Sequence, residues 1–169
     1  MILNFRGTSG SGKTTVVRGL MAKYPTITPL GEFPEKKPDG YECRPGVDKF
    51  NKILPNLYVV GSYKNTCGGC DGIKTQDEAC ARVRRYAALG DVLFEGLLIS
   101  HIFGRYKLLD QEMKKEHGHT TIWAFLDTPL ELCLDRIRAR RDARAAAKGK
   151  EPKPLNTQNT EDKWHDARR

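Results

Sequence analysis

The sequence predicts a three-layer α/β domain in which helices cover both faces of a mainly parallel sheet. Short apolar segments alternate with helix-like segments along the chain, and this order is typical of that architecture. The segment 91–100 (DVLFEGLLIS) is apolar on both sides of its polar interruptions, as expected of a central parallel strand. The length of 169 residues suits a single domain over 1–169.

The individual elements follow from local patterns. We expect four main strands, numbered first to fourth, at 1–6, 57–63, 91–100 and 120–126, and one further strand at 27–33 within an insertion. We expect helices at 14–24, 75–89, 101–118 and 127–150, and a short helix near the end of the chain. Thr75 with Glu78 forms a capping box at the second helix. The stretch 26–56 is rich in Pro, Gly and Lys and is expected to be a long insertion that serves the substrate region.

The composition indicates a soluble globular protein with an anionic partner. Hydrophobic residues make up 38% and charged residues 30% of the chain, and the net charge is +8. No apolar run approaches the roughly 20 residues that span a bilayer. The apolar run at the start of the sequence is too short for a signal peptide. We therefore expect a cytoplasmic protein with no membrane partner. Its five cysteines are not expected to form disulfides.

Residues 7–14 (GTSGSGKT) fit the phosphate-binding pattern G-x-x-x-x-G-K-[ST], known as the P-loop or Walker A motif. Glycines let such a loop turn its backbone N–H groups inward onto phosphate oxygens, and the following helix adds its positive end. Lys13 is expected to reach the β- and γ-phosphates, and the Thr14 hydroxyl is expected to hold Mg²⁺. ATP and Mg²⁺ are the implied cofactors. The expected nucleotide-binding residues of this motif are Gly7, Ser9, Gly10, Ser11, Gly12, Lys13, Thr14 and Thr15.

The segment after the fourth strand discriminates among P-loop proteins. FLDTP (125–129) leads into LELCLDRIRARR (130–141), which resembles the nucleotide and nucleoside kinases of the P-loop class. This resemblance implies an arginine-rich lid at 136–155 that closes over the triphosphate and stabilises the transferring phosphoryl group. A solvated basic helix face is the alternative. We assign Arg136 and Arg140 to nucleotide binding, and Arg138 and Arg141 to catalysis.

Two acids are expected beside the γ-phosphate. Asp71 follows the second strand and Glu95 ends the run DVLFE of the third, and ligands in open α/β sheets bind beyond the carboxyl ends of strands. A kinase needs a carboxylate to deprotonate or orient the acceptor hydroxyl. We assign Asp71 as the general base and Glu95 as the acid that holds Mg²⁺ together with Thr14. The reverse assignment of the two acids stays open, and Asp71 can also be a turn residue.

The stretch TCGGCDG (66–72) contains a C-x-x-C pair that can signal a metal or redox site. A structural zinc site needs a second ligand pair, and the sequence contains no second C-x-x-C and no H-x-x-x-H. We interpret the stretch as a substrate loop. Gly68 and Gly69 let its backbone approach the acceptor, and Asp71 performs the chemistry.

A narrower resemblance covers about residues 1–141. The combination GSYKNTCGGCDGIKTQDE (61–78) and DVLFEGLLIS resembles a group of phage-encoded P-loop kinases that includes the 5-hydroxymethyluracil-DNA kinases. The resemblance implies transfer of the γ-phosphate of ATP to the hydroxymethyl group of a modified pyrimidine within DNA. It also implies a bacteriophage protein that acts in the host cytoplasm. The expected acceptor-site residues are Tyr63, Lys64, Gly68, Gly69, Ser100 and Arg105.

The charge distribution agrees with a DNA partner. Residues 135–169 contain eleven Lys and Arg against six Asp and Glu, which favours contact with backbone phosphates. A kinase of a free nucleoside, nucleotide or other small hydroxyl compound is the alternative, and a non-catalytic nucleotide-binding module is a third reading. The tail departs from the kinase pattern, since it has no fifth strand to hold adenine. Either the C-terminal segment is truncated or adenine is held otherwise, for example by Arg141 and the tail.

Overall fold

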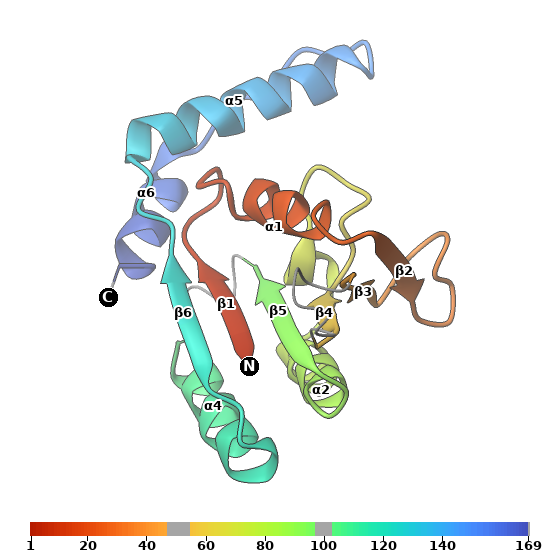
Figure 1. Cartoon of the computed structure of the whole chain (residues 1–169). Helices are drawn as coiled ribbons and strands as arrows, with labels where there is room; N and C mark the ends of the chain where they lie inside the picture. Colours follow the sequence, from red (N-terminus) through yellow and green to blue (C-terminus); the bar gives the residue numbers. More distant parts are fainter. Residues whose placement is uncertain (47–54, 97–102, 169) are drawn as a thin grey trace.

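The computed structural model describes residues 1–46, 55–96 and 103–168. These residues form a sheet with helices on both faces (Figure 1). The strands are β1 (Ile2–Arg6), β2 (Thr26–Leu30), β3 (Gly40–Arg44), β4 (Leu57–Val60), β5 (Asp91–Glu95) and β6 (Thr121–Phe125). The helices are α1 (Lys13–Met21), α2 (Gln76–Ala87), α4 (Phe103–His117), α5 (Leu130–Ala146) and α6 (Thr157–Asp166), with a 3₁₀ turn η1 (Gly69–Gly72).

The sheet is mixed, with the strand order β2-β3-β4-β5-β1-β6. The neighbours β4, β5, β1 and β6 are parallel, as the sequence predicts. The strands β2 and β3 add an antiparallel extension at one edge. The predicted insertion at 26–56 therefore supplies two strands, and the prediction of one strand at 27–33 was incomplete. The sequence GYECR of β3 has no apolar run, and the strand is fixed by pairing with neighbours on both sides.

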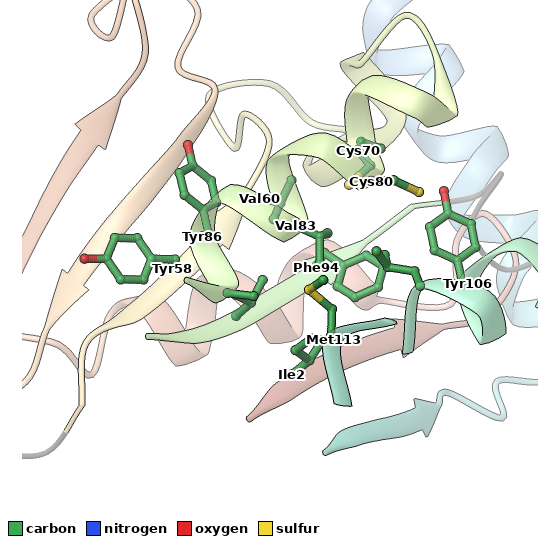
Figure 2. Close-up of a cluster of buried hydrophobic side chains, with 14 residues drawn as sticks. Ile2, Tyr58, Val60, Cys70, Cys80, Val83, Tyr86, Phe94, Tyr106 and Met113 are labelled. Atoms are coloured by element: carbon green, nitrogen blue, oxygen red, sulfur yellow. The ribbon is translucent and has the colours of Figure 1, made fainter. Parts of the chain in front are cut away.

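Side chains of alternate strand residues fill two cores, one on each face. Val92 and Phe94 of β5 join a cluster with side chains from α2 and α4, and Figure 2 shows this cluster. Leu93, the residue between them, packs on the other face with Val17 of α1. This period-two alternation produces the predicted three layers. It also turns the acid that follows Phe94 toward the α1 face, where the phosphate-binding loop lies.

Several element ends differ from the predicted ones for local reasons. β4 ends at Val60 because Gly61 has φ +87° and turns the chain. α5 starts at Leu130, since Pro129 takes the N-cap position. The predicted Thr75 cap of α2 is confirmed, and its side chain accepts a hydrogen bond from the Glu78 backbone N–H at 3.2 Å. The predicted third strand ends at Glu95, and its residues 97–100 lie outside the described residues.

The helices in the described parts of the chain are too short or too polar to cross a lipid bilayer.

Gly61 is expected to be intolerant of any side chain. Gly69 of η1 packs directly against Gly61 at the end of β4. A methyl group at Gly61 would overlap the carbonyl group of Gly69. We expect Gly61→Ala to lower the free energy of unfolding by about 2 kcal/mol or more, because overpacking adds to the left-handed backbone cost. Gly118→Ala is the matched control, since Gly118 has φ +66° with open space around it, and it should cost about 1 kcal/mol. Urea unfolding of both variants measures the difference, and equal losses would contradict the close packing of Gly61.

Candidate active site

The loop between β1 and α1 has the backbone shape that its glycines allow. Gly7, Gly10 and Gly12 have φ values of +142°, +82° and +99°, in the region that side-chain-bearing residues rarely adopt. A Cβ at Gly10 would lie 2.5 Å from the carbonyl oxygen of Cys133, so the loop also packs closely against α5. The sequence therefore sets both the curvature of the loop and its contact with the arginine-bearing helix.

Lys13 is the buried cation of this loop. Its Nζ donates hydrogen bonds to the carbonyl oxygens of Gly7 at 2.7 Å and Thr8 at 3.0 Å. Burial lowers the pKa of Lys13, while Glu95 and Asp71 oppose that shift. The hydroxyl oxygens of Thr8 and Ser11 are also buried, with no hydrogen-bond partner in the described structure. A buried ammonium group among unpaired polar groups fits a polyphosphate, which supplies the missing negative charge and the acceptor oxygens.

Thr14 connects the P-loop helix to the end of β5 and to the substrate loop. Its hydroxyl donates a hydrogen bond to Glu95 Oε1 at 2.9 Å and accepts one from the Gly68 backbone N–H at 3.5 Å. This hydroxyl and carboxylate are hard oxygen donors and fit Mg²⁺, which keeps several waters and needs few protein ligands. The structure thus brings together the two residues predicted to hold the metal.

Glu95 is an almost fully buried carboxyl group, with 1% of its surface exposed. Burial raises its pKa from the ordinary 4.5 to about 7. The charge of Lys13, the hydrogen bond from Thr14 and the nearby Tyr63 side chain act in the opposite direction, and the charge of Asp71 adds to the increase. Glu95 therefore titrates near neutral pH in the free protein, and a cation bound beside it favours the ionised form.

A cavity of about 690 Å³ lies in front of the P-loop. Its wall includes Lys13 and Thr14 from the P-loop, Asp71 from η1 and Glu95 from β5. Asp71 is exposed and occupies the middle of η1, directly after the buried Cys70. The structure therefore places both predicted acids at one cavity, together with the predicted phosphate-binding residues.

Two of the four predicted lid arginines reach this cavity. Arg136 donates a hydrogen bond to the Gly10 carbonyl oxygen at 3.0 Å. Arg140 donates to Ser9 Oγ at 3.2 Å and to Cys67 Sγ at 3.5 Å. Arg140 therefore bridges the P-loop and the loop at 66–72.

Arg138 and Arg141, predicted as catalytic, lie elsewhere in this structure. Arg138 forms an ion pair with Asp135 at 3.0 Å, and Arg141 donates to the carbonyl oxygens of Lys153 at 2.9 Å and Pro154 at 3.1 Å. Both line a separate cavity of about 280 Å³ between α5 and the following segment. Successive helix residues are rotated by about 100°, so these two arginines leave the face that carries Arg136 and Arg140.

None of the predicted acceptor-site residues that the structure describes lines the cavity, and they are divided between buried and exposed positions. Tyr63 is buried and packs against Gly68, and Gly69 lies against Glu95. Lys64 instead donates to the carbonyl oxygen of Glu35. Arg105 forms an exposed ion pair with Asp77. Ser100 lies outside the described residues.

The sequence analysis missed several residues that line or brace the cavity. Thr128 donates a hydrogen bond to the Ser11 carbonyl oxygen at 2.9 Å, and its own carbonyl oxygen accepts one from the Trp164 indole at 2.9 Å. Thr128 therefore links α6 to the P-loop, and the DTP motif after the fourth strand was the signal for it. Further cavity-lining residues that the sequence analysis did not select are Arg18, Thr66, Cys67, Asp127, Pro129 and Leu132.

The C-x-x-C cysteines lie in different environments. Cys70 is buried in the core beside α2, whereas Cys67 is exposed and faces Arg140 and Arg144 at 3.5 and 3.8 Å. No group of three or more His, Cys, Asp or Glu side chains in the described residues has an arrangement that could hold a metal ion.

Sequence comparison finds similar proteins among phage kinases. The chain is 39% identical over 164 residues to the 5-hmdU DNA kinase of Pseudomonas phage PaMx11, covering 96% of this chain and 79% of that protein. It is 39% identical over 147 residues to the 5-hmdU DNA kinase of Pseudomonas phage M6, covering 82% and 71%. A third relative, the 5-hmdU DNA kinase of Delftia phage PhiW-14, is 26% identical over 175 residues, with 59% of its length covered. No protein-family model and no solved structure matches the chain.

The raised pKa of Glu95 predicts a pH-dependent stability of the free protein. Between about pH 4.5 and 7 the folded protein keeps a proton that the unfolded chain releases, so the free energy of unfolding falls as pH rises. In wild type this fall in the free energy of unfolding should be on the order of 3 kcal/mol over the range, and Glu95→Gln should remove it. Urea unfolding without nucleotide, in a metal chelator, measures it.

Glu112→Gln is the control for this experiment. Hydrogen bonding to Arg84 lowers the pKa of Glu112, so the stability lost in Glu112→Gln should stay constant from pH 5 to 7.5 and shrink only at lower pH. The difference in the free energy of unfolding between wild type and Glu95→Gln should change from pH 5 to 7.5. A constant difference would contradict the predicted titration of the buried Glu95.

Proposed function

The chain belongs to the family of phage 5-hmdU DNA kinases, and we propose that it transfers the γ-phosphate of ATP to the hydroxymethyl group of 5-hydroxymethyluracil in DNA. The identity of 39% to two such kinases over most of the chain supports this activity. The observation that carries the proposal is the single cavity that joins a complete P-loop to two carboxylates. The donor phosphates and the acceptor hydroxyl then meet in one place.

The proposed donor site uses the P-loop for binding and charge compensation. The loop N–H groups and the Lys13 ammonium group hold the β- and γ-phosphates, and the nucleotide exchanges the carbonyl contacts of Lys13 for phosphate contacts. Thr14 and Glu95 would hold Mg²⁺, which when bound neutralises charge on the β- and γ-phosphate oxygens. The negative phosphates offset the desolvation of Lys13 in this buried site.

The proposed transfer step is an in-line displacement. The oxygen of the hydroxymethyl group attacks the γ-phosphorus and forms a new P–O bond, while the bond to the β–γ bridging oxygen breaks and ADP leaves. The hydroxyl proton passes to the carboxylate of Asp71. Asp71 suits this role because it is exposed to the cavity, whereas Glu95 is buried beneath Thr14 and bonded to it.

DNA is the proposed partner because α5 carries further positive side chains beyond those that line the cavity. Arg144, Lys148 and Lys150 continue α5 and the following turn beyond Arg140, and all three are exposed. In Figure 1, α5 extends across the carboxyl-end side of the sheet, above the P-loop and α1. Contacts between these side chains and backbone phosphates predict binding that weakens as the salt concentration rises.

The test of the proposed function compares acceptors of different kinds. The protein is incubated with ATP labelled in the γ-phosphate, and with duplex DNA that contains either 5-hydroxymethyluracil or thymine at the same positions. The free nucleoside and nucleotide of 5-hydroxymethyluracil serve as further acceptors. We expect label only on the modified DNA and no transfer by Lys13→Ala. Label on the monomers alone would favour the small-molecule kinase, and full transfer by Lys13→Ala would exclude P-loop chemistry.

Arg140 is expected to be the arginine that stabilises the transferring phosphoryl group. We expect Arg140→Ala to reduce kcat by about 10²-fold or more, because it removes a cation between the P-loop and the substrate loop. Arg138→Ala is the matched control from the same helix, and its kcat should stay within about threefold of wild type because a surface ion pair contributes little. Equal losses in the two variants would show that the lid rearranges before transfer.

Asp71 is expected to be essential for turnover and dispensable for nucleotide binding. Asp71→Asn keeps the size of the side chain and removes the proton acceptor, so kcat should fall by about 10²-fold or more. The Kd of ATP, measured by calorimetry, should change little. Normal turnover in Asp71→Asn would indicate that Glu95 is the general base.

A further inference from the structure

A second, smaller cavity is lined by residues of η1, the start of α2 and α4, and by no residue of the P-loop. Its volume of about 20 Å³ is on the scale of one water-sized group. Asp71 lines this cavity as well as the large one, and Gly96, directly after Glu95, forms part of its wall. The cavity is therefore adjacent to the proposed point of transfer, on the side away from the phosphates.

Two side chains place unpaired polar atoms at this cavity. The hydroxyl group of Tyr106 and the amide oxygen of Gln76 are buried and have no hydrogen-bond partner among the described residues. Tyr106 is 1% exposed as a whole. Buried polar groups are rarely left unpaired, because each costs the lost hydration without a compensating hydrogen bond. Two such atoms at one small cavity indicate that a ligand completes them.

The two side chains are held by rigid elements. Gln76 is the first residue of α2, directly after the Thr75 cap. Tyr106 belongs to α4, and its ring packs against Phe94 with 5.8 Å between the ring centroids. The ring is enclosed in the core of Figure 2, and Tyr106 is one of the residues that line the small cavity. Burial also raises the pKa of Tyr106 well above the ordinary value, so the hydroxyl keeps its proton and can donate.

We propose that this cavity receives the C4 carbonyl oxygen of the acceptor pyrimidine, which accepts a hydrogen bond from the Tyr106 hydroxyl while Gln76 Oε1 accepts the neighbouring N3–H. The inference rests on the proposed function and names how the base is recognised. In 5-hydroxymethyluracil the ring carbon that carries the hydroxymethyl group is bonded to C4, and N3 follows. A hydroxyl group placed at Asp71 therefore brings the carbonyl oxygen beside Asp71, where the small cavity lies.

The arrangement discriminates between two hydroxymethylated bases. Cytosine carries an amino group at C4 and no hydrogen on N3, so it presents the opposite pattern of donors and acceptors. A site that hydrogen-bonds one pattern leaves buried groups unpaired against the other, and such sites can reject the wrong substrate strongly. Specificity for the modified uracil then comes from the base edge as well as from the hydroxymethyl group.

The test measures kcat/KM on duplex DNA containing either 5-hydroxymethyluracil or 5-hydroxymethylcytosine. We expect wild type to prefer the uracil by about 10²-fold or more. Tyr106→Phe and Gln76→Ala should each lower kcat/KM on the uracil substrate about tenfold and reduce the preference. Tyr86→Phe is the matched control. Tyr86 is buried in the same cluster, at the opposite end in Figure 2, with its hydroxyl beside Gly40 and away from the cavity.

Thermal unfolding separates recognition from structural support. The Tyr106 hydroxyl has no hydrogen-bond partner within the described parts of the chain, so Tyr106→Phe should leave the midpoint unchanged or raise it while activity falls. Loss of activity that parallels a lowered midpoint would overturn the inference, as would equal use of both bases by wild type. Wild-type activity in Tyr106→Phe would also overturn the inference. No transfer to either DNA by wild type would instead refute the proposed function itself.

Discussion

The hydrogen bond from Thr14 to Glu95 is the constraint on which the site depends. It joins the first turn of α1 to the end of β5, and the Gly68 N–H approaches the same hydroxyl from the substrate loop. Glu95 is buried without a full counter-charge, since Lys13 directs its hydrogen bonds to backbone carbonyls. Burial makes the ionised form of such a carboxyl group unfavourable. A cation at the Thr14 hydroxyl would lower the free-energy cost of ionisation. Binding of the cation and ionisation of Glu95 are therefore coupled.

This constraint explains the unusual composition of the substrate loop. A Cβ at Gly69 would lie 2.5 Å from the Glu95 carbonyl oxygen, and one at Gly68 would lie 2.6 Å from the Tyr63 ring. Only glycine lets η1 rest directly on the end of β5 at both positions. Cys70 then enters the core and Asp71 emerges at the cavity. The C-x-x-C spacing is thus a result of packing, with one thiol buried and the other facing the lid helix.

The fold and the site were predictable to different extents, for physical reasons. The P-loop, its flanking strand and helix, and the two acids follow from local sequence, because spacing and strand ends determine where they lie. The antiparallel strand β3 does not, since GYECR is stabilised by pairing rather than by an apolar pattern. Helical periodicity alone could have predicted that the lid arginines lie on different faces of α5, because Arg138 and Arg141 are rotated away from Arg136. Tyr106 and Gln76 could not be found, because only the tertiary packing brings an α4 hydroxyl to the start of α2.

Asp71 belongs to both cavities, and this position organises the proposed reaction. The P-loop side presents cations and backbone N–H groups, which suit phosphate, whereas the other side presents one hydroxyl and one amide oxygen, which suit a neutral polar ring. A 3₁₀ turn of four residues separates the two environments. The single carboxylate at this boundary can contact only a hydroxyl that is attached to a group lying in the second environment. Recognition of the acceptor and removal of its proton then occur at the same turn, so a base with the wrong edge also misplaces its hydroxyl group.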